Sequence, residues 1–451
     1  MHRHLNHSTR AVFLALLSAV LWLPVPISFA ATVRELVQAQ VQKEYASLVT
    51  FYKDLHAHPE LSFQEERTAR KVADELKQAG FAVTTKVGGN GVVGVWRNGS
   101  GPTILVRTDL DALPVKEETG LSYASTNRAK GDQGNEVSVM HACGHDMHMT
   151  VFIGTARTLA ALKDHWQGTL VLIGQPAEER VGGARQMIAD GLFNRFPRPD
   201  YCLALHVNGS LAAGSVGYTE GYALANVDTV DITFRGVGGH GSAPHMTKDP
   251  IVLAAQAILA FQTIVSRETE PGNPAVVTVG SIHGGTKHNI IPDEVKLQLT
   301  VRSYTDEVRT NTITSIKRIT RAMAQAAGVP DNRMPVVTLS DESVSATFND
   351  PPLTRRLSGA FQSWLGADKT VAIKPVMGAE DFSEYGRTQE KIPICMFWLG
   401  AVEPKRVEES RQSGVPLPSL HSSRFAPVPE PTIRTGVTAM TAAVLELAGK
   451  K

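Results

Sequence analysis

Residues 169–207 read TLVLIGQPAEERVGGARQMIADGLFNRFPRPDYCLALHV, and this stretch decides the fold class. Its two apolar runs, at 169–174 and 201–207, predict buried strands. The segment between them, GGARQMIADG at 182–191, predicts a helix. Two strands joined through a helix lie parallel in one sheet, with the helix on a face of that sheet. The stretch therefore predicts an α/β protein.

The segments before this unit continue the same alternation. Residues 65–79 place apolar side chains at helical spacing and are followed by Gly80, and residues 150–162 predict a second helix. Short runs rich in Val and Ile predict three more strands, at 81–87, 91–96 and 103–107. We therefore expect the larger domain to hold a mostly parallel sheet with helices on both faces.

The order of elements changes between residues 224 and 339. This segment predicts strand, helix, strand, strand, helix, strand, which is the order of the ferredoxin-like split unit. It predicts a small α+β domain inserted into the larger one, whose two parts are residues 31–223 and 340–451. The second part is expected to hold a helix, the strand PICMFWLG and a closing helix at 430–448, with an irregular loop at 401–420.

The first thirty residues, 1–30, predict an export signal. A basic start, MHRHLNHSTR, is followed by about a dozen apolar residues and then by Ser28-Phe29-Ala30, a pattern that favours cleavage after Ala30. Because the apolar run is short for a bilayer span, we expect no stable membrane anchor and a periplasmic or secreted protein. The chain has 3 cysteines, so at least one thiol lies outside any intramolecular disulfide.

The composition narrows the class of partner. Lys and Arg number 45 against 44 Asp and Glu, which leaves no broad charged surface for nucleic acid or an anionic membrane. The apolar share of 42% and the charged share of 20% over 451 residues are ordinary for a globular protein with two cores. We therefore expect a small-molecule substrate that is recognised at a local site.

Residues with metal-binding chemistry gather at the ends of the predicted strands. They are Asp109 and Asp111 after the run at 103–107, Glu178 and Glu179 after the run at 169–174, and His206 inside the run at 201–207. HACGHDMH at 141–148 adds Cys143 and three histidines just before a predicted helix. Sites in parallel sheets form beyond the carboxyl ends of the strands, and thiolate, imidazole and carboxylate groups bind zinc and related divalent metals. We therefore expect a metal site at this edge of the sheet.

Each of these residues also has an interpretation without metal. His206 alone would be a buried core histidine, the paired glutamates a solvated helix start, and Cys143 an inert thiol. Two adjacent glutamates nevertheless suit two tasks in a hydrolase, because one can bind a metal while its neighbour takes a proton from water. A closed, non-catalytic metal-binding module is the alternative, although such a site has no use for a base at Glu178.

Two further motifs are near matches to other chemistries. GVGGHG at 236–241 satisfies the dinucleotide-binding pattern, but Ser-Ala-Pro follows it where a helix should begin. AGSVG at 213–217 is close to the nucleophile motif of serine hydrolases, but its first position is Ala213, and no acid and histidine follow in convincing order. We therefore expect neither nucleotide binding nor serine hydrolysis.

Several longer motifs together resemble one enzyme family. RTDLDALPV, HACGHDMH, QPAEE, GGHGSAPH and HNIIP occur in this order, with LHAHPELSFQEERTA at 55–69 and MGAEDFSEY at 377–385. They resemble the two-metal aminoacylase and carboxypeptidase family of amidohydrolases, in the branch of hippurate hydrolase, N-acyl amino acid amidohydrolases and auxin-conjugate (IAA-amino acid) hydrolases. The resemblance spans nearly the whole chain after the signal. It implies a catalytic domain of the phosphorylase/hydrolase-like class and a ferredoxin-like lid.

The resemblance also implies a role for each residue of the site. Two divalent ions, of Zn, Mn, Co or Ni, would be bound by Cys143 as the bridging ligand together with His145, Glu179, His206 and His421. Glu178 would be the general base, and Asp109 would orient a ligand. The substrate would be an N-acyl or peptidyl amino acid with a free carboxylate, and its amide bond would be hydrolysed.

The lid would take part in both assembly and catalysis. The resemblance implies a homodimer through the lid, in which His240 reaches the site of the other subunit and stabilises the oxyanion, while Asn289 and Arg302 hold the substrate carboxylate. An arginine suits this task because its planar fork matches a carboxylate. Glu380 would lie near the substrate. An exported metallo-aminopeptidase or dipeptidase is the alternative, and an aminopeptidase would need an acidic pocket for a free amine.

The remaining histidines and cysteines have weaker indications. His141, His148, Glu380 and Asp381 belong to the matching motifs, and their chemistry alone assigns them no role. We expect them to support the ligands or to line the pocket. His56 and His58 are expected to be structural. Cys202 and Cys395 lie in apolar runs and are expected to be buried thiols, although a disulfide between them is left open in an exported protein.

Overall fold

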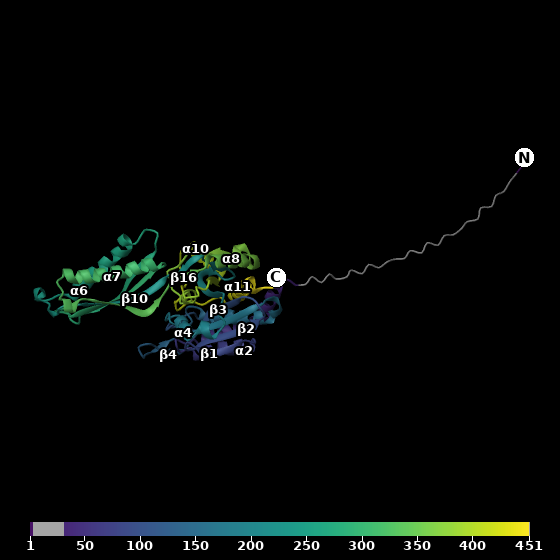
Figure 1. The fold of residues 1–451 in the computed structure, drawn as a ribbon, viewed down its shortest axis with the longest axis horizontal. Coiled ribbons are helices and arrows are strands. Elements are labelled where there is room, and N and C mark those ends of the chain that lie inside the picture. The colour runs from purple at the N-terminus through teal and green to yellow at the C-terminus, as the bar shows by residue number, and fades with distance from the viewer. Residues whose placement is uncertain (3–30, 451) are drawn as a thin grey trace.

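The computed structural model describes residues 1–2 and 31–450 and shows a large main domain with a smaller lid beside it (Figure 1). The predicted export signal therefore lies almost wholly outside the described residues. The main domain is built on an eight-stranded sheet in the order β1-β2-β6-β3-β7-β18-β8-β17. Its strands are β1 Ala82–Val87, β2 Gly91–Asn98, β3 Thr103–Asp109, β6 Gly168–Gln175, β7 Tyr201–Ala212, β8 Val216–Tyr218, β17 Thr370–Ala372 and β18 Ile394–Val402.

The four central strands of this sheet are parallel, as the sequence predicts. β6, β3, β7 and β18 pair in parallel, whereas β1 with β2, β2 with β6, and β18 with β8 pair antiparallel. The sheet is therefore mixed, with antiparallel pairs toward its two sides. The carboxyl ends of the parallel strands still meet at one edge, which is the edge where the expected ligands fall.

Helices cover both faces of the sheet. One face is covered by α1 Val33–Ala57, α2 Glu66–Gln78, α3 His145–Ala161, α8 Pro351–Leu365 and α11 Pro429–Ala448, and the other by α4 Gly183–Ala189, α5 Leu192–Arg195 and α9 Ser383–Gly386. Along β3, Ile104 and Val106 pack on the first group of helices while Leu105 packs on the second. Because both faces of the sheet are buried, the sequences of the central strands are almost continuously apolar.

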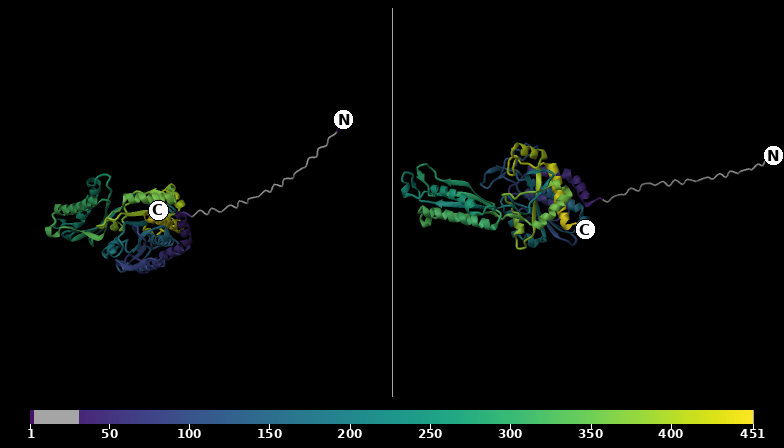
Figure 2. Two further views of the ribbon diagram at one scale, coloured as in Figure 1. Left: turned by 45° about the vertical axis from the view of Figure 1, so that its right-hand side comes forward. Right: turned by 90° about the horizontal axis from the view of Figure 1, so that it is seen from above.

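The lid has its own sheet, in the order β12-β14-β10-β15, and it extends away from the main domain in both views of Figure 2. Its elements are β10 Asn226–Arg235, α6 Pro250–Thr263, β12 Ala275–Gly284, β14 Glu294–Ser303, α7 Asp306–Ala326 and β15 Val336–Val344. All neighbouring strands are antiparallel, and α6 and α7 pack on each other and on β14. This is the predicted ferredoxin-like order, and its sheet runs past the expected boundary at 339 to Val344.

Short paired segments complete the structure. They are the hairpin β4 Arg128–Lys130 with β5 Glu136–Ser138, the pair β9 Gly221–Leu224 with β16 Thr347–Asn349 where the chain crosses between domains, and the pair β11 Gly239–His240 with β13 Ile290–Ile291 in the lid. The GVGGHG segment does not open directly into a helix, because the three-residue turn Pro244–Met246 lies between it and α6. This agrees with the expectation that the segment is not a dinucleotide site.

Three local predictions differ from the structure. Helix α3 begins at His145 rather than near 150, because polar residues of its first turn face the interior and hide the apolar periodicity. Strand β7 continues beyond 207 to Ala212, paired with β18. The loop 401–420 contains the helix α10 Pro404–Ser413, whose charged sequence leaves no residue buried.

The cysteines left open by the sequence are free thiols. Cys202 packs among the side chains on the α4 side of the sheet, whereas Cys395 packs on the α3 side. The two strands that carry them are neighbours, but the side chains point to opposite faces, so a disulfide between them has no geometry available.

Candidate metal centre

The predicted ligands converge at the carboxyl edge of the main sheet. Asp109 is the last residue of β3, Glu178 and Glu179 lie in the turn after β6, and His206 lies on β7 beyond the last residue that pairs with β3. Cys143 and His145 stand at the start of α3. Segments that are far apart in the sequence thus deliver their side chains to one place.

Gly144 sets the spacing between the two ligands of the HACGHDMH segment. It is the N-cap of α3 and has a left-handed backbone with φ 81. A Cβ atom at this position would lie 2.6 Å from a methyl group of Val207. Only glycine therefore lets the start of α3 approach β7 this closely, and this approach brings Cys143 beside His206.

Hydrogen bonds orient the two imidazoles of the centre. His206 donates from Nδ1 to its neighbour's carbonyl, Val207 O, at 2.8 Å, and its Nε2 lies 3.5 Å from Cys143 Sγ. His145 donates from Nδ1 to Asp111 O at 2.8 Å, and its buried Nε2 has no partner among the described residues. Both rings are therefore held through Nδ1 and direct Nε2 into the centre, which is how histidine ligands are commonly oriented for a metal.

A second group of donors shares Cys143 with the first. Ligand atoms of Cys143, Glu179 and His421 all lie within 4.8 Å of one another, as do those of Cys143, His145 and His206. His421 Nε2 is 3.5 Å from Glu179 Oε1, and its backbone N–H donates to Ala142 O at 2.9 Å. The sulfur of Cys143 therefore belongs to two groups of possible ligand atoms at once.

The donor set fits divalent cations. Ligand atoms around one zinc ion lie about 3–4 Å apart, and the two groups of atoms are packed on this scale. The buried Oε1 of Glu179 and Nε2 of His145 have no hydrogen-bond partner in the part of the chain that the structure describes. Unpaired buried polar atoms are costly, and a cation bound between them would remove that cost.

The charges of the centre also favour a bound cation. Burial raises the pKa of Cys143 and of Glu178 well above the usual ranges, and it raises the pKa of Glu179 to about 7. Burial alone would lower the pKa of His145, but the charge of Asp109 and the bond to Asp111 raise it to about 10. Without a cation the site thus holds too much negative charge, and it is a mixed thiolate, imidazole and carboxylate site of the kind that binds transition metals.

A buried ionic network lies behind the ligands. Arg107 pairs with Asp109 at 2.7 Å, Glu380 at 2.8 Å and Asp381 at 3.1 Å, and all four side chains are almost completely buried. The other oxygen of Asp109 accepts from His148 Nδ1 at 2.8 Å. Asp109 is therefore fixed from two sides next to His145. Glu380, expected near the substrate, lies in this network and does not line the cavity described next.

The ligands face a cavity between the main domain and the lid. The cavity over the centre measures about 470 Å³ and is lined from the main domain by Cys143, Glu178, Glu179, His206 and His421. The lid contributes Val227, Thr229, Arg302 and Glu342 to its wall. The centre is therefore open to a small molecule between the two domains.

Arg302 is the one predicted lid residue that reaches this cavity. It is partly buried on β14 and donates from Nη1 to Met377 O at 2.7 Å, and burial lowers its pKa. None of the ion pairs among the described residues involves it, so its remaining N–H groups have no carboxylate partner. His240 and Asn289 lie together on the exposed surface of the lid, where Gly241 N donates to Asn289 O, and neither lines the cavity.

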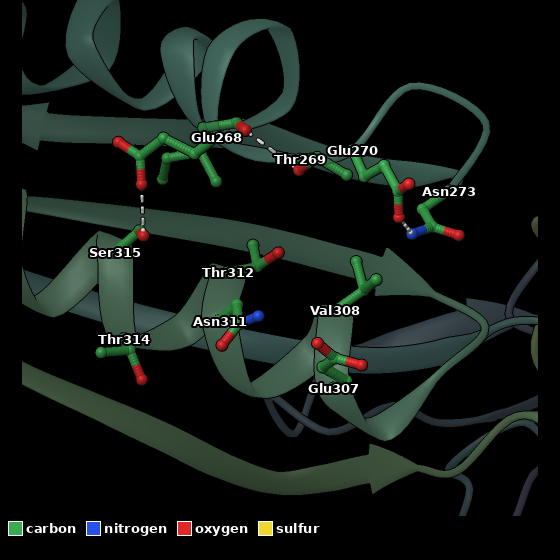
Figure 3. Close-up of a pocket in the computed structure, with 11 residues that line it drawn as sticks. Glu268, Thr269, Glu270, Asn273, Glu307, Val308, Asn311, Thr312, Thr314 and Ser315 are labelled. Carbon is green, nitrogen blue, oxygen red and sulfur yellow. Dashed lines mark hydrogen bonds between the residues drawn. The ribbon is translucent and has the colours of Figure 1, made fainter.

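A separate cavity of about 420 Å³ lies on the lid, between the end of α6 and the start of α7 (Figure 3). It is lined by acidic and polar side chains, and none of the predicted site residues belongs to it. Glu268 already accepts from Ser315 and pairs with Arg318, and Glu270 accepts from Asn273. With no histidine or cysteine among its lining residues, this cavity does not resemble the metal centre.

Sequence reasoning missed one contributor to the centre, Arg107. Arg107 stands as a lone charge inside the apolar strand TILVR, and that position was the available signal, because a buried arginine needs carboxylate partners. His148 was expected to support the ligands or line the pocket, and it accepts from Val207 N at 2.9 Å while it donates to Asp109. Which carboxylate meets which cation depends on contacts between distant segments, so no local pattern could show it.

Comparisons with known proteins agree with this geometry. The chain matches peptidase family M20/M25/M40 over residues 105–420. It is 35% identical over 407 residues to thermostable carboxypeptidase 1 of Saccharolobus solfataricus, covering 89% of this chain and 96% of that protein. It is 38% identical over 332 residues to hippurate hydrolase of Campylobacter jejuni, covering 73% and 82%.

A solved structure is similar over both domains. The YxeP protein of Bacillus subtilis, described as a dinuclear metal-binding peptidase of the M20 family, gives a TM-score of 0.72 at 29% identity and covers 90% of this chain and 99% of that one. The matched family segment includes the lid and all the proposed ligands except His421, which follows its last residue directly. The resemblance read from the motifs is confirmed. This chain belongs to peptidase family M20/M25/M40 and is a metal-dependent hydrolase of amide bonds.

Proposed function

We propose that this protein hydrolyses the amide bond of N-acyl or peptidyl amino acids that carry a free carboxylate. The observation that carries the proposal is the position of Arg302 in the same cavity as Cys143 and Glu178. A cation with no carboxylate partner at one end, and a metal centre at the other, suit a substrate with an anionic group beside its amide bond. The names of the relatives, hippurate hydrolase and carboxypeptidase, support this substrate class.

Glu178 is the general base of the proposed reaction. Its Oε2 lies 3.8 Å from His145 Nε2, so the carboxylate faces the metal centre. Burial, followed by the charges of Glu380 and Glu179, raises its pKa and makes it a better proton acceptor than an exposed glutamate. It takes a proton from the attacking water and passes it to the nitrogen of the leaving amino acid. Divalent ions at the centre would polarise the substrate carbonyl and make the water more acidic.

An aminopeptidase is the weaker alternative for this cavity. A free amine would require an unpaired carboxylate away from the metal ligands, and Glu342 is the remaining acid of the wall. Glu342 already pairs with Arg180 at 2.5 Å. The unpaired charged group of the wall is therefore the cation of Arg302, which favours an anionic substrate group.

The test is a turnover panel on metal-free and metal-restored protein. N-acyl amino acids are compared with the same compounds whose carboxylate is converted to an amide, and with peptides that have a free amine. Zn, Mn, Co and Ni are added singly, because mixed thiolate, imidazole and carboxylate sites accept each of them. We expect two ions per subunit and activity on the free carboxylates. Turnover that survives complete chelation, or activity confined to free-amine peptides, would overturn the proposal.

We also propose a homodimer through the lid. Strand β12 is an edge of the lid sheet, and Ile282 on it is 49% exposed, while Leu259 on the neighbouring α6 is 72% exposed. An apolar edge strand beside an apolar helix face is a common place for a second copy to pair. The dimer would bring His240 of one subunit to the site of the other, as the resemblance implies.

We also propose that the protein is exported and that its signal is cleaved after Ala30. The support for this is the basic start, the apolar run and the small residues before Ala31. N-terminal sequencing of protein purified from the producing cells should begin at Ala31, and a mature protein that still begins at Met1 would contradict export with cleavage.

A further inference from the structure

A second cavity lies beside the metal centre, on the side of the β4–β5 hairpin. It measures about 530 Å³ and lies between this hairpin, the segment after β3 and the turn after β6. We call it the hairpin cavity. Its wall includes Glu179, which also lines the cavity over the metal centre. Glu179, a proposed metal ligand, therefore belongs to the walls of both cavities.

Arg180 stands at the boundary between the two cavities. Its Nη1 is 2.5 Å from Asp132 at the tip of the hairpin, and its Nη2 is 2.5 Å from Glu342 on the lid. Asp132 lines the hairpin cavity, whereas Glu342 lines the cavity over the centre. The arginine thus ties the hairpin to the lid directly after Glu179 in the sequence.

The chemistry of the hairpin cavity differs from that of the cavity with Arg302. Apolar side chains of Leu61, Leu113 and Val137 contribute to its wall, and Leu61 belongs to a small cluster of buried apolar residues. Its single cation, Arg180, is already paired with two carboxylates. The cavity therefore offers an apolar surface and no free positive charge, so it suits a neutral, apolar group.

We propose that the hairpin cavity is the subsite for the acyl half of the substrate, while the cavity with Arg302 holds the amino acid half. This inference rests on the proposed function. An amide bond at the centre has its two halves on opposite sides, and the cavities lie on two sides of Glu179. The occupant is an apolar acyl chain or ring larger than acetyl, and the hairpin residues determine which acyl groups are accepted.

The first test narrows the cavity with Val137→Phe. The ratio of kcat/KM for an N-benzoyl amino acid to kcat/KM for the N-acetyl derivative of the same amino acid should fall by at least about tenfold. The matched control is Glu136→Phe, which adds the same ring one residue earlier, where alternate side chains of a strand point to the other face. Glu136 is exposed and does not line the cavity, so the control should keep the wild-type ratio.

The second test measures substrate binding in the absence of turnover. All three natural cysteines are buried, so Asn135→Cys would place an accessible thiol on the cavity wall. Its reaction with a maleimide is measured on metal-loaded protein that also carries Glu178→Gln, so that the substrate is not consumed. N-benzoyl amino acid should slow the labelling, and the N-acetyl derivative should slow it less. Ser363→Cys, exposed on α8 and away from both cavities, should label at one rate throughout.

The outcomes separate this inference from the proposed function. If the wild-type enzyme hydrolyses N-acyl amino acids but Val137→Phe keeps the ratio and Asn135→Cys is not protected, the acyl group binds elsewhere and the subsite is refuted. If the wild-type enzyme hydrolyses none of these compounds, the proposed function fails first. The unfolding curve would show whether Val137→Phe is misfolded. In that case the labelling of Asn135→Cys tests the subsite without the Val137→Phe variant.

Discussion

His56 and Asp146 form a fully buried ion pair, with His56 Nδ1 2.6 Å from Asp146 Oδ2, immediately beside the ligand His145. His56 Nε2 lies 3.0 Å from Glu117 on its other side. Burial lowers the pKa of His56, but the bonds and charges of these two carboxylates outweigh it and raise the pKa to about 10. The last turn of α1 is thereby fastened to the first turn of α3, which carries the metal ligands.

Replacing His56 with leucine should destabilise the protein by about 3 kcal/mol near neutral pH, because two carboxylates are left buried without their cation. The pKa of His56 is raised above its usual 6.5, so the stabilisation is complete below about pH 6.5 and is lost as the pH rises through about 10. Urea unfolding curves at several pH values measure the difference between variant and wild type. His58→Leu, an exposed histidine two residues later, is the control, and an equal loss at pH 7 and above pH 10 would contradict the assignment.

Replacing Glu178 with glutamine should lower kcat on the order of a thousandfold without loss of metal, because the amide cannot accept a proton. Glu179→Gln is the adjacent contrast, since it removes a proposed ligand and should lower the metal content as well. Kinetics together with metal analysis of the purified variants distinguish the two. Near wild-type turnover in Glu178→Gln would show that Glu178 is not the general base.

Replacing Asp109 with asparagine should weaken metal binding by roughly 10–100-fold, because Asp109 holds both Arg107 and His148 around the centre. Competition between the protein and a chelator of known affinity gives the constants. The change should appear in metal affinity even where saturating metal restores part of the activity. Unchanged affinity would show that Asp109 does not support the ligands.

Replacing Arg302 with methionine should lower kcat/KM for free-carboxylate substrates by on the order of a hundredfold, which corresponds to the loss of charged hydrogen bonds. Substrates with an amidated carboxylate should lose much less. Arg235→Met, on an exposed position of the same lid sheet, is the matched control. Equal losses on both kinds of substrate would mean that Arg302 acts through the structure of the cavity and not through the carboxylate.

Replacing Leu259 with glutamate should shift the protein from dimer to monomer, because this 72% exposed side chain would place a charge in the proposed apolar contact. Analytical ultracentrifugation gives the mass of each form. A wild-type monomer at micromolar concentration would contradict the dimer. If His240 acts in the other subunit, the monomeric variant should also lose turnover while it keeps its metal.

Local sequence patterns predicted most elements of this fold because period and residue type are properties of short segments. Six of the eight strands of the main sheet and the order of the six lid elements were predicted, whereas the short strands β8 and β17 were not. The start of α3 was misplaced because its first turn carries Asp146 and His148, whose polar side chains are buried by contacts that the segment itself does not contain. Helix α10 was missed because its charged surface has no apolar stripe to reveal it.

The sequence by itself determined the residue chemistry of the site: thiol, imidazoles and adjacent glutamates at the carboxyl ends of strands, in motifs that resemble one family. Only the tertiary structure decided how these groups are used. It placed His421 against Glu179, surrounded Arg107 with three carboxylates, and left His240 and Asn289 outside the cavity of their own chain. The physical reason is range, because a motif is written in neighbouring residues, whereas charge pairing and burial are set by segments that meet only after folding.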